Sequence, residues 1–301
     1  MLAEFIDPAI LGFILVGVML FAIFVGFPIS FTLIFLGFIF GYLGFGHLVF
    51  YLMTLQFSMV MTEQALAAVP LFIFMGIMME QAGLMERLFS AFQLMLAKVR
   101  GSLYYAVLFV SVIFAAATGI VGASVTILGI MAAKSMNKSG YDIRLSAGTI
   151  TAGGTLGILI PPSIMLIVYA AIAELSPLRL YAAAIIPGFT LAGFYMIYVI
   201  TYAYFKPSIA PKPLEEEVPP TRVIIVQLLT SFVPLALLIM SVLGSILMGL
   251  ATPAEAAAIG ASGGLFLAFC YKSLTWTGLK QSVFLTAKTT SMVCWLFVGS
   301  W

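Results

Sequence analysis

The chain has 301 residues, of which 63% are hydrophobic and 8% carry charged side chains. This composition excludes a soluble globular domain and is typical of an all-α polytopic membrane protein. The net charge of +2, with no basic patch interleaved with aromatic residues, gives no sign that nucleic acid is a partner.

The first apolar run extends between positions 7 and 63 and contains no Asp, Glu, Lys or Arg. A membrane-spanning helix needs about 20 residues, so we expect two helices that meet near Gly26-Phe27-Pro28. A third helix is expected over residues 69–83. Together these are the scaffold helices, residues 8–83.

Residues 84–98 have a different pattern. Leu88, Phe92 and Met95 recur at helical spacing beside Glu86 and Arg87. This pattern predicts an amphipathic arm helix that lies in the membrane interface.

The run from Gly101 to Ala133 contains no charged residue. A single straight helix of this length would be about 50 Å long, whereas the hydrocarbon core is about 30 Å thick. Glycines at its middle therefore predict a re-entrant hairpin over residues 101–137 with its tip near mid-membrane. Both ends should be cytoplasmic, because basic residues flank them. These are Lys98, Arg100, Lys134, Lys138 and Arg144.

A broken helix is predicted over residues 142–174. Its uncharged middle contains Gly153-Gly154-Thr155-Leu156-Gly157 and then Ile160-Pro161-Pro162-Ser163. Broken backbone at membrane depth persists only where it is buried in protein or lines a wet cavity or an ion site. The alternative is a proline kink that neighbouring helices repair.

The remaining segments complete the predicted topology. A helix over 178–205 precedes a proline-rich linker, residues 206–222, which we expect to be an extended cytoplasmic tether. Residues 223–248 and 254–270 should form helices on either side of a break at 249–253. An amphipathic segment, 271–288, then precedes an apolar helix that starts near Thr289. Only about 13 residues of that helix are present, so we expect the chain to be truncated at its C-terminus.

The order of these segments repeats. The break at 249–253 follows one apolar helix and precedes another, as Gly26-Phe27-Pro28 does in the first half. We therefore predict an inverted-topology repeat, with residues 1–205 as the first copy and 223–301 as the start of the second. Such repeats place the transport site on discontinuous helices near the bilayer midplane. A second hairpin should follow Trp301.

The two predicted breaks suggest a cation site. Carbonyls at the ends of broken helices, together with hydroxyls, suit a hard cation such as sodium. For each hydroxyl, the alternative is a bond back to a carbonyl of its own helix. The candidate ion-binding residues are Thr118, Gly119, Ser124, Gly154, Thr155, Gly157, Pro161 and Ser163.

The same breaks suggest an anion site. Helix N-termini offer free amides and a favourable dipole to a substrate carboxylate. No arginine occupies a central membrane position, so amides, hydroxyls and sodium would have to hold the anion. The candidate substrate-binding residues are Gly122, Ala123, Ser124, Pro162 and Ser163.

Other polar residues have simpler readings. Glu255, just after Pro253, either caps its helix or relays an ion. Cys270 and Cys294 lie in apolar segments and are expected to be core residues without a disulfide. No cofactor and no metal other than sodium is expected.

Four segments together resemble the large membrane subunit of tripartite ATP-independent periplasmic (TRAP) transporters, and their order covers the whole chain. At the hairpin tip, Thr118 and Ile120 replace serines that many members carry. This variation resembles the branch associated with 2-oxo acids, mannitol and chloroaromatic compounds. The segments are Val69-Pro70-Leu71-Phe72-Ile73-Phe74-Met75-Gly76, Ala115-Ala116-Ala117-Thr118-Gly119-Ile120-Val121-Gly122-Ala123-Ser124, Gly154-Thr155-Leu156-Gly157 through Ile160-Pro161-Pro162-Ser163, and Ala251-Thr252-Pro253-Ala254-Glu255-Ala256-Ala257-Ala258-Ile259-Gly260-Ala261.

The resemblance implies a sodium-driven uptake system in the bacterial inner membrane. A periplasmic binding protein would deliver an organic anion, and a small four-helix membrane subunit would pack against the large one. Transport in this family resembles an elevator in which hairpins move against a scaffold. No ATP would be used.

Three alternatives remain open at this point. A stand-alone sodium:anion symporter would share the fold without needing a binding protein. An intramembrane enzyme is disfavoured because the apolar segments hold no paired aspartates and no nucleophile beside a base. A scaffold subunit would gain nothing from the two breaks.

Overall fold

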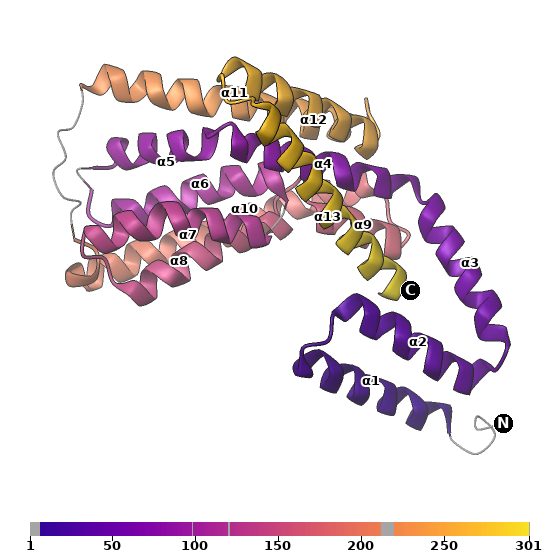
Figure 1. Cartoon of the computed structure of the whole chain (residues 1–301). Helices are drawn as coiled ribbons and strands as arrows, with labels where there is room; N and C mark the ends of the chain where they lie inside the picture. Colours follow the sequence, from indigo (N-terminus) through magenta and orange to yellow (C-terminus); the bar gives the residue numbers. More distant parts are fainter. Residues whose placement is uncertain (1–6, 98, 120, 212–219, 301) are drawn as a thin grey trace. The chain divides into compact units, whose positions relative to one another are not determined.

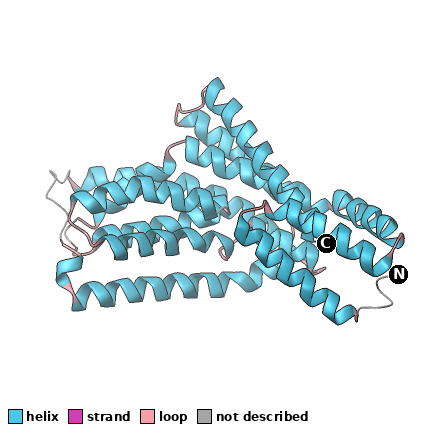
Figure 2. Cartoon of the chain, turned by 60° about the horizontal axis from the view of Figure 1, so that its bottom comes forward, coloured by secondary structure: helices cyan, strands magenta, loops and turns pink. Residues whose placement is uncertain are grey.

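The structure is a computed structural model that describes residues 7–97, 99–119, 121–211 and 220–300; the side chains of Pro8, Thr118 and Ala123 are outside the described part. The described residues form thirteen α-helices and no strand (Figures 1 and 2). Five helical stretches are long and apolar enough to cross a membrane, so the chain is an all-α polytopic membrane protein. They are Gln64–Gln81, Pro177–Phe205, Thr221–Leu247, Pro253–Cys270 and Trp276–Ser300.

Most of the helices follow one another with short connections, and the longest connection is the linker between α10 and α11. Short 3-10 turns η2 (Gln64–Ala67), η3 (Leu156–Ile158) and η4 (Pro207–Ile209) separate some of them. The α-helices are α1 (Pro8–Val25), α2 (Ile29–Phe45), α3 (Leu48–Thr62), α4 (Ala68–Gln81), α5 (Leu84–Met95), α6 (Ser102–Thr118), α7 (Val121–Lys138), α8 (Ile143–Thr155), α9 (Ile164–Ile172), α10 (Pro177–Phe205), α11 (Thr221–Leu247), α12 (Pro253–Cys270) and α13 (Trp276–Ser300).

The chain divides into two compact units, residues 1–64 with 287–301, and residues 65–286. In the first unit, three helices occupy the run in which we predicted two, so that prediction is wrong. Gly46, with φ 61°, ends α2, and α3 begins two residues later. Hydropathy could not show this turn, because the residues around it are as apolar as the helices.

The prediction for the last segment is also wrong. We expected an amphipathic stretch to 288 and a separate helix from Thr289, but α13 runs continuously from Trp276. No glycine or proline lies between Leu279 and Val298, so nothing in the local sequence ends the helix.

In the second unit, α4 packs closely against α12. A Cβ added at Gly264 would lie 3.4 Å from Met78 Cβ, and one at Gly260 would meet the Met75 side chain. Small residues at four-residue spacing allow such close helix packing inside a membrane.

The arm helix α5 ends at Met95, three residues before the predicted boundary, and Lys98 lies outside the described residues. Its apolar face is packed inside the unit, where Phe92 stacks on Phe109 with ring centroids 5.5 Å apart. Its location in the membrane interface stays a prediction.

The predicted tether is not extended at its start. Residues 207–209 form η4, and the Ile209 carbonyl accepts hydrogen bonds from Tyr104 Oη at 3.1 Å and the Asp142 amide at 3.2 Å. The Leu103 amide donates to the Tyr141 hydroxyl at 3.5 Å, and burial raises the pKa of that hydroxyl. The two bonds to the Ile209 carbonyl attach the first part of the linker to the open end of the hairpin, whereas residues 212–219 lie outside the described part.

Candidate functional site

Helices α6 and α7 form a hairpin, and α8 lies beside both of them (Figure 1). Glycines allow this contact. A Cβ added at Gly153 would lie 2.9 Å from Ser111 Cβ on α6, and one at Gly154 would lie 3.0 Å from the Val125 amide nitrogen on α7. Gly154 therefore serves close packing between helices, in addition to any part it plays in shaping carbonyls.

The hairpin turns at Gly119. Helix α6 ends at Thr118, and Gly119 adopts a left-handed conformation with φ 60° while its amide bonds to the Ala115 carbonyl at 3.2 Å. Glycine adopts this conformation without steric cost, which explains the residue at this position. Helix α7 begins at Val121.

The second break separates α8 from α9. After η3, the Ile160 amide bonds to the Leu156 carbonyl at 2.9 Å, and Pro161 and Pro162 have no amide hydrogen to donate. No group among the described residues donates a hydrogen bond to the main-chain oxygens of residues 159–162. These four carbonyls therefore have lone pairs to offer, although the segment is largely buried.

The two breaks contact each other. A Cβ added at Gly119 would lie 3.1 Å from the Ile164 amide nitrogen and 3.2 Å from the Pro162 carbonyl oxygen. Since α6 and α8 run in the same direction, both bring C-terminal carbonyls toward this point, while α7 and α9 begin there and direct the N–H groups of their first turns toward it. One location thus offers oxygen ligands for a cation and N–H donors for an anion.

Ser163 is fully buried at the start of α9. Its hydroxyl donates to the Ile158 carbonyl at 2.7 Å, and its own carbonyl accepts from Tyr181 Oη at 3.2 Å and from the Ile167 amide at 3.3 Å. The hydroxyl hydrogen bond links the two sides of the break, and the Ser163 hydroxyl oxygen keeps its lone pairs.

Sequence reasoning missed two residues of α10 that support the break. Tyr181 is completely buried and holds the Ser163 carbonyl, and an added Cβ at Gly188 would lie 3.1 Å from Ile160 Cγ1. A lone tyrosine in an apolar helix gives no signal. The position of Gly188 next to Pro187 was the only available hint.

The other predicted ligands are placed less centrally. Thr155 is exposed and its hydroxyl donates to the Ala152 carbonyl at 2.7 Å, so the back-bond expected as the alternative is present. Ser124 is buried, whereas Gly122 faces open space. The side chains of Thr118 and Ala123 lie outside the described residues.

A small apolar cluster packs against the second break, between α8 and α9. Leu156 and Ile160 pack with Ala115 and Ala116 of α6. Gly157 and Pro161 are buried within the same segment. Small alanines on α6 allow the irregular segment to approach the hairpin.

Glu255 caps its helix. The Glu255 carboxylate accepts hydrogen bonds from the Thr252 amide at 2.7 Å and the Thr252 hydroxyl at 2.9 Å, which is a capping box. Cys270 and Cys294 are both free thiols, but the expectation that Cys270 is a core residue is wrong because its side chain is exposed at the end of α12.

The chain matches known families over nearly its whole length. The family model described as "Tripartite ATP-independent periplasmic transporter, DctM component" matches residues 16–300. The C4-dicarboxylate TRAP transporter large permease protein DctM of Pseudomonas aeruginosa is 32% identical over 78% of this chain and 54% of its own length. The protein of the same name from Vibrio cholerae is 34% identical over 69% of this chain and 45% of its own.

A third relative covers more of the chain. The sialic acid TRAP transporter large permease protein SiaM of Vibrio cholerae is 28% identical over 92% of this chain and 64% of its own length. The chain thus spans about half to two thirds of the length of these curated relatives.

Proposed function

Because the chain belongs to the DctM family of tripartite ATP-independent periplasmic transporters, we propose that it forms part of a large permease that takes up an organic carboxylate by sodium symport. The observation that carries this proposal is the contact between the hairpin tip and the broken helix, at Gly119, Pro162 and Ile164. It brings the free carbonyls of residues 159–162 and the N-terminal turns of α7 and α9 together in an apolar surrounding, where electrostatic interactions are stronger than in water.

Sodium would be held by oxygen atoms on the carbonyl side of this contact. The free carbonyls of residues 159–162 are the first candidates, because no described group competes for them. Ser163 and Thr155 hydroxyls each donate their hydrogen to a carbonyl and keep lone pairs for a cation. Ser124 and Thr118 are the hydroxyl candidates from the hairpin.

The substrate carboxylate would be held on the amide side. The first turns of α7 and α9, which begin at Val121 and Ile164, point their N–H groups at the contact. Gly122 is exposed with open space around it, so a ligand group has room to approach the main chain there. Bound sodium would add a positive charge that favours the anion.

The proposed partners are those that the names of the relatives imply. Relatives are named as permeases of tripartite transporters for C4-dicarboxylates and sialic acid, so we propose a periplasmic binding protein and a small membrane subunit as partners. The inverted repeat is part of this proposal. The connections after α1 and after α11 both contain a left-handed glycine, Gly26 and Gly249, and a proline follows at the boundary of the next helix, Pro28 just before α2 and Pro253 as the first residue of α12.

The experiment is uptake by the full-length permease in proteoliposomes with its partner subunits. C4-dicarboxylates, sialic acid and 2-oxo acids would be offered with an inward sodium gradient or with potassium. We expect accumulation that requires sodium, and its loss when Pro161 and Pro162 are both replaced by alanine. Pro234→Ala, a change inside α11 and outside the site, is the control.

Two results would count against the proposal. Equal uptake in sodium and potassium would reject symport, and unchanged uptake by the double proline variant would reject the site. Full uptake without the binding protein would instead favour a stand-alone symporter of the same fold.

A further inference from the structure

A groove separate from the two breaks runs between α8 and α10. It has a volume of about 850 Å³ and extends from η4 along both helices as far as Ala152 and Phe194. Thr155 and the residues of the second break do not line it.

The floor and walls are mainly apolar. Leu108 and Val199 are buried at the floor. Thr149 is also buried, and its hydroxyl donates a hydrogen bond to the Leu145 carbonyl at 2.8 Å. Gly148 widens the groove, because nothing lies within 4 Å of a Cβ added there. An acyl chain fits this surface better than a small polar solute does.

Tyrosines follow one wall of the groove along α10. Tyr195, Tyr198 and Tyr202 recur at spacings of three and four residues, so they share one helix face. The Tyr198 and Tyr202 rings stack with centroids 5.8 Å apart. Tyrosine rings of this kind are enriched where a membrane protein meets the lipid headgroups.

The mouth of the groove carries positive charge. Arg144 and Lys206 line it from α8 and from the end of α10, and both are exposed. The Asp142 carboxylate also lines it, but accepts the Leu145 amide at 2.8 Å as the N-cap of α8. Lys206 Nζ lies 5.2 Å from the centre of the Tyr202 ring, which places its charge beside the tyrosine wall.

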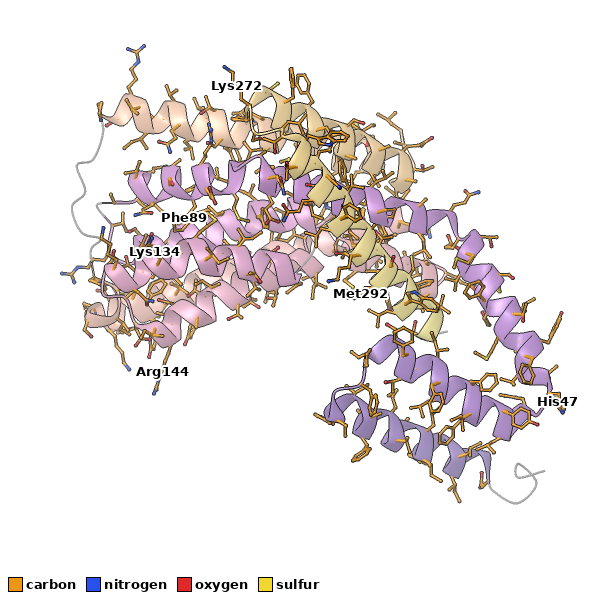
Figure 3. All side chains as sticks on the ribbon, in the orientation of Figure 1. His47, Phe89, Lys134, Arg144, Lys272 and Met292 are labelled. Atoms are coloured by element: carbon orange, nitrogen blue, oxygen red, sulfur yellow. The ribbon has the colours of Figure 1, made fainter. Side chains whose placement is uncertain are left out.

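The mouth lies on the side predicted to be cytoplasmic. Figure 3 shows Arg144 and Lys134 at the same end of the helices of this unit, where basic residues flank the hairpin. Anionic lipids give this membrane surface its negative potential, and basic pockets between transmembrane helices bind their headgroups.

We propose that this groove binds one anionic phospholipid. The headgroup phosphate lies between Arg144 and Lys206, and an acyl chain lies along Gly148, Ala152 and the tyrosine wall. Charge complementarity at the mouth selects an anionic headgroup over a zwitterionic one. The apolar walls select a lipid over a soluble phosphate.

The test measures lipid retention by the full-length protein, using native mass spectrometry of detergent-solubilised samples titrated with phosphatidylglycerol or phosphatidylcholine. Each positive charge near the membrane surface contributes about fivefold to binding. Arg144→Gln and Lys206→Gln should therefore each weaken phosphatidylglycerol binding about fivefold, and the double variant about 25-fold. Arg222→Gln removes an exposed charge outside the groove and should leave binding unchanged.

Two further comparisons examine the walls and the source of the phosphate. Gly148→Trp fills the groove and should abolish the tightest phosphatidylglycerol adduct, whereas Gly129→Trp, at a glycine of α7 that is equally free of neighbours, should not. Inorganic phosphate at millimolar concentration should not displace the lipid. Equal retention of the two lipids, unchanged binding by the double charge variant, or displacement by phosphate would each overturn the proposal.

Discussion

Replacing Gly119 by alanine is the most direct test of the contact between the hairpin and the broken helix. Alanine in the left-handed conformation costs about 1–2 kcal/mol. Its Cβ would also press on two main-chain atoms, the Ile164 nitrogen at 3.1 Å and the Pro162 oxygen at 3.2 Å. Because neither is the end of a flexible side chain, the two breaks must move apart by a few tenths of an ångström, which adds cost of the kind seen in overpacked cores.

Together these terms give at least about 2 kcal/mol against the contacted arrangement. A cost of 1.4 kcal/mol corresponds to a factor of ten, so the population competent to bind should fall about 30-fold. The assay is sodium-driven uptake in proteoliposomes, with the sodium concentration for half-maximal uptake as the readout.

Gly129→Ala is the matched control for this substitution. Gly129 is helical and has no atom within 4 Å of an added Cβ, so alanine should stabilise α7 by about 0.5–1 kcal/mol and leave uptake intact. Wild-type uptake with unchanged sodium dependence in Gly119→Ala would refute the idea that this contact forms the site.

Four other substitutions have defined outcomes. Tyr181→Phe removes the hydroxyl that donates to the Ser163 carbonyl, which keeps its bond from the Ile167 amide; we expect a loss of about 1 kcal/mol, seen as a drop of about 2–4 °C in the thermal midpoint. Thr155→Val should raise the half-maximal sodium concentration about tenfold, since bonds to charged groups contribute about 1.5–3 kcal/mol. Thr252→Ala should destabilise the protein by about 1 kcal/mol through loss of the N-cap, measured by thermal unfolding, while Glu255→Gln keeps uptake.

Three of these four substitutions have a control or a contradicting result. Tyr204→Phe, at an exposed ring, should not shift the thermal midpoint, and an equal shift in both variants would remove the special role of Tyr181. Thr190→Val breaks the same kind of back-bond, to the Ile186 carbonyl, outside the site. If it changes sodium dependence as much as Thr155→Val does, Thr155 is not a ligand. Loss of uptake in Glu255→Gln would revive an ion-relay role.

The sequence was sufficient to predict both breaks because local backbone chemistry produces them, although the single prolines Pro187 and Pro234 leave α10 and α11 continuous. Gly119, with its left-handed φ, and Pro161-Pro162, without amide hydrogens, interrupt their helices in the structure where the sequence placed interruptions. The capping of α12 by Thr252 and Glu255 is equally local.

Features that depend on tertiary packing were not predictable in the same way. Gly154 was interpreted as shaping a carbonyl, yet it also lets α8 approach Val125. Tyr181 could not be found, because its role depends on where α10 passes the break. The separate helix α3 was missed because hydropathy counts residues and does not show that the apolar run after Gly46 is a helix of its own.

The pair Gly153-Gly154 has a mechanical consequence. Helix α8 packs so closely against α6 and α7 that no side chain fits between them at Gly153 and Gly154. Neither hairpin helix can therefore slide past α8 without steric collision. Tyr181 links α10 to the second break through its hydrogen bond to the Ser163 carbonyl. The Ile209 carbonyl, just after α10, accepts a hydrogen bond from Tyr104 of α6. If this protein works by displacing its cargo across the bilayer, helices α6, α7 and α8 should therefore move together.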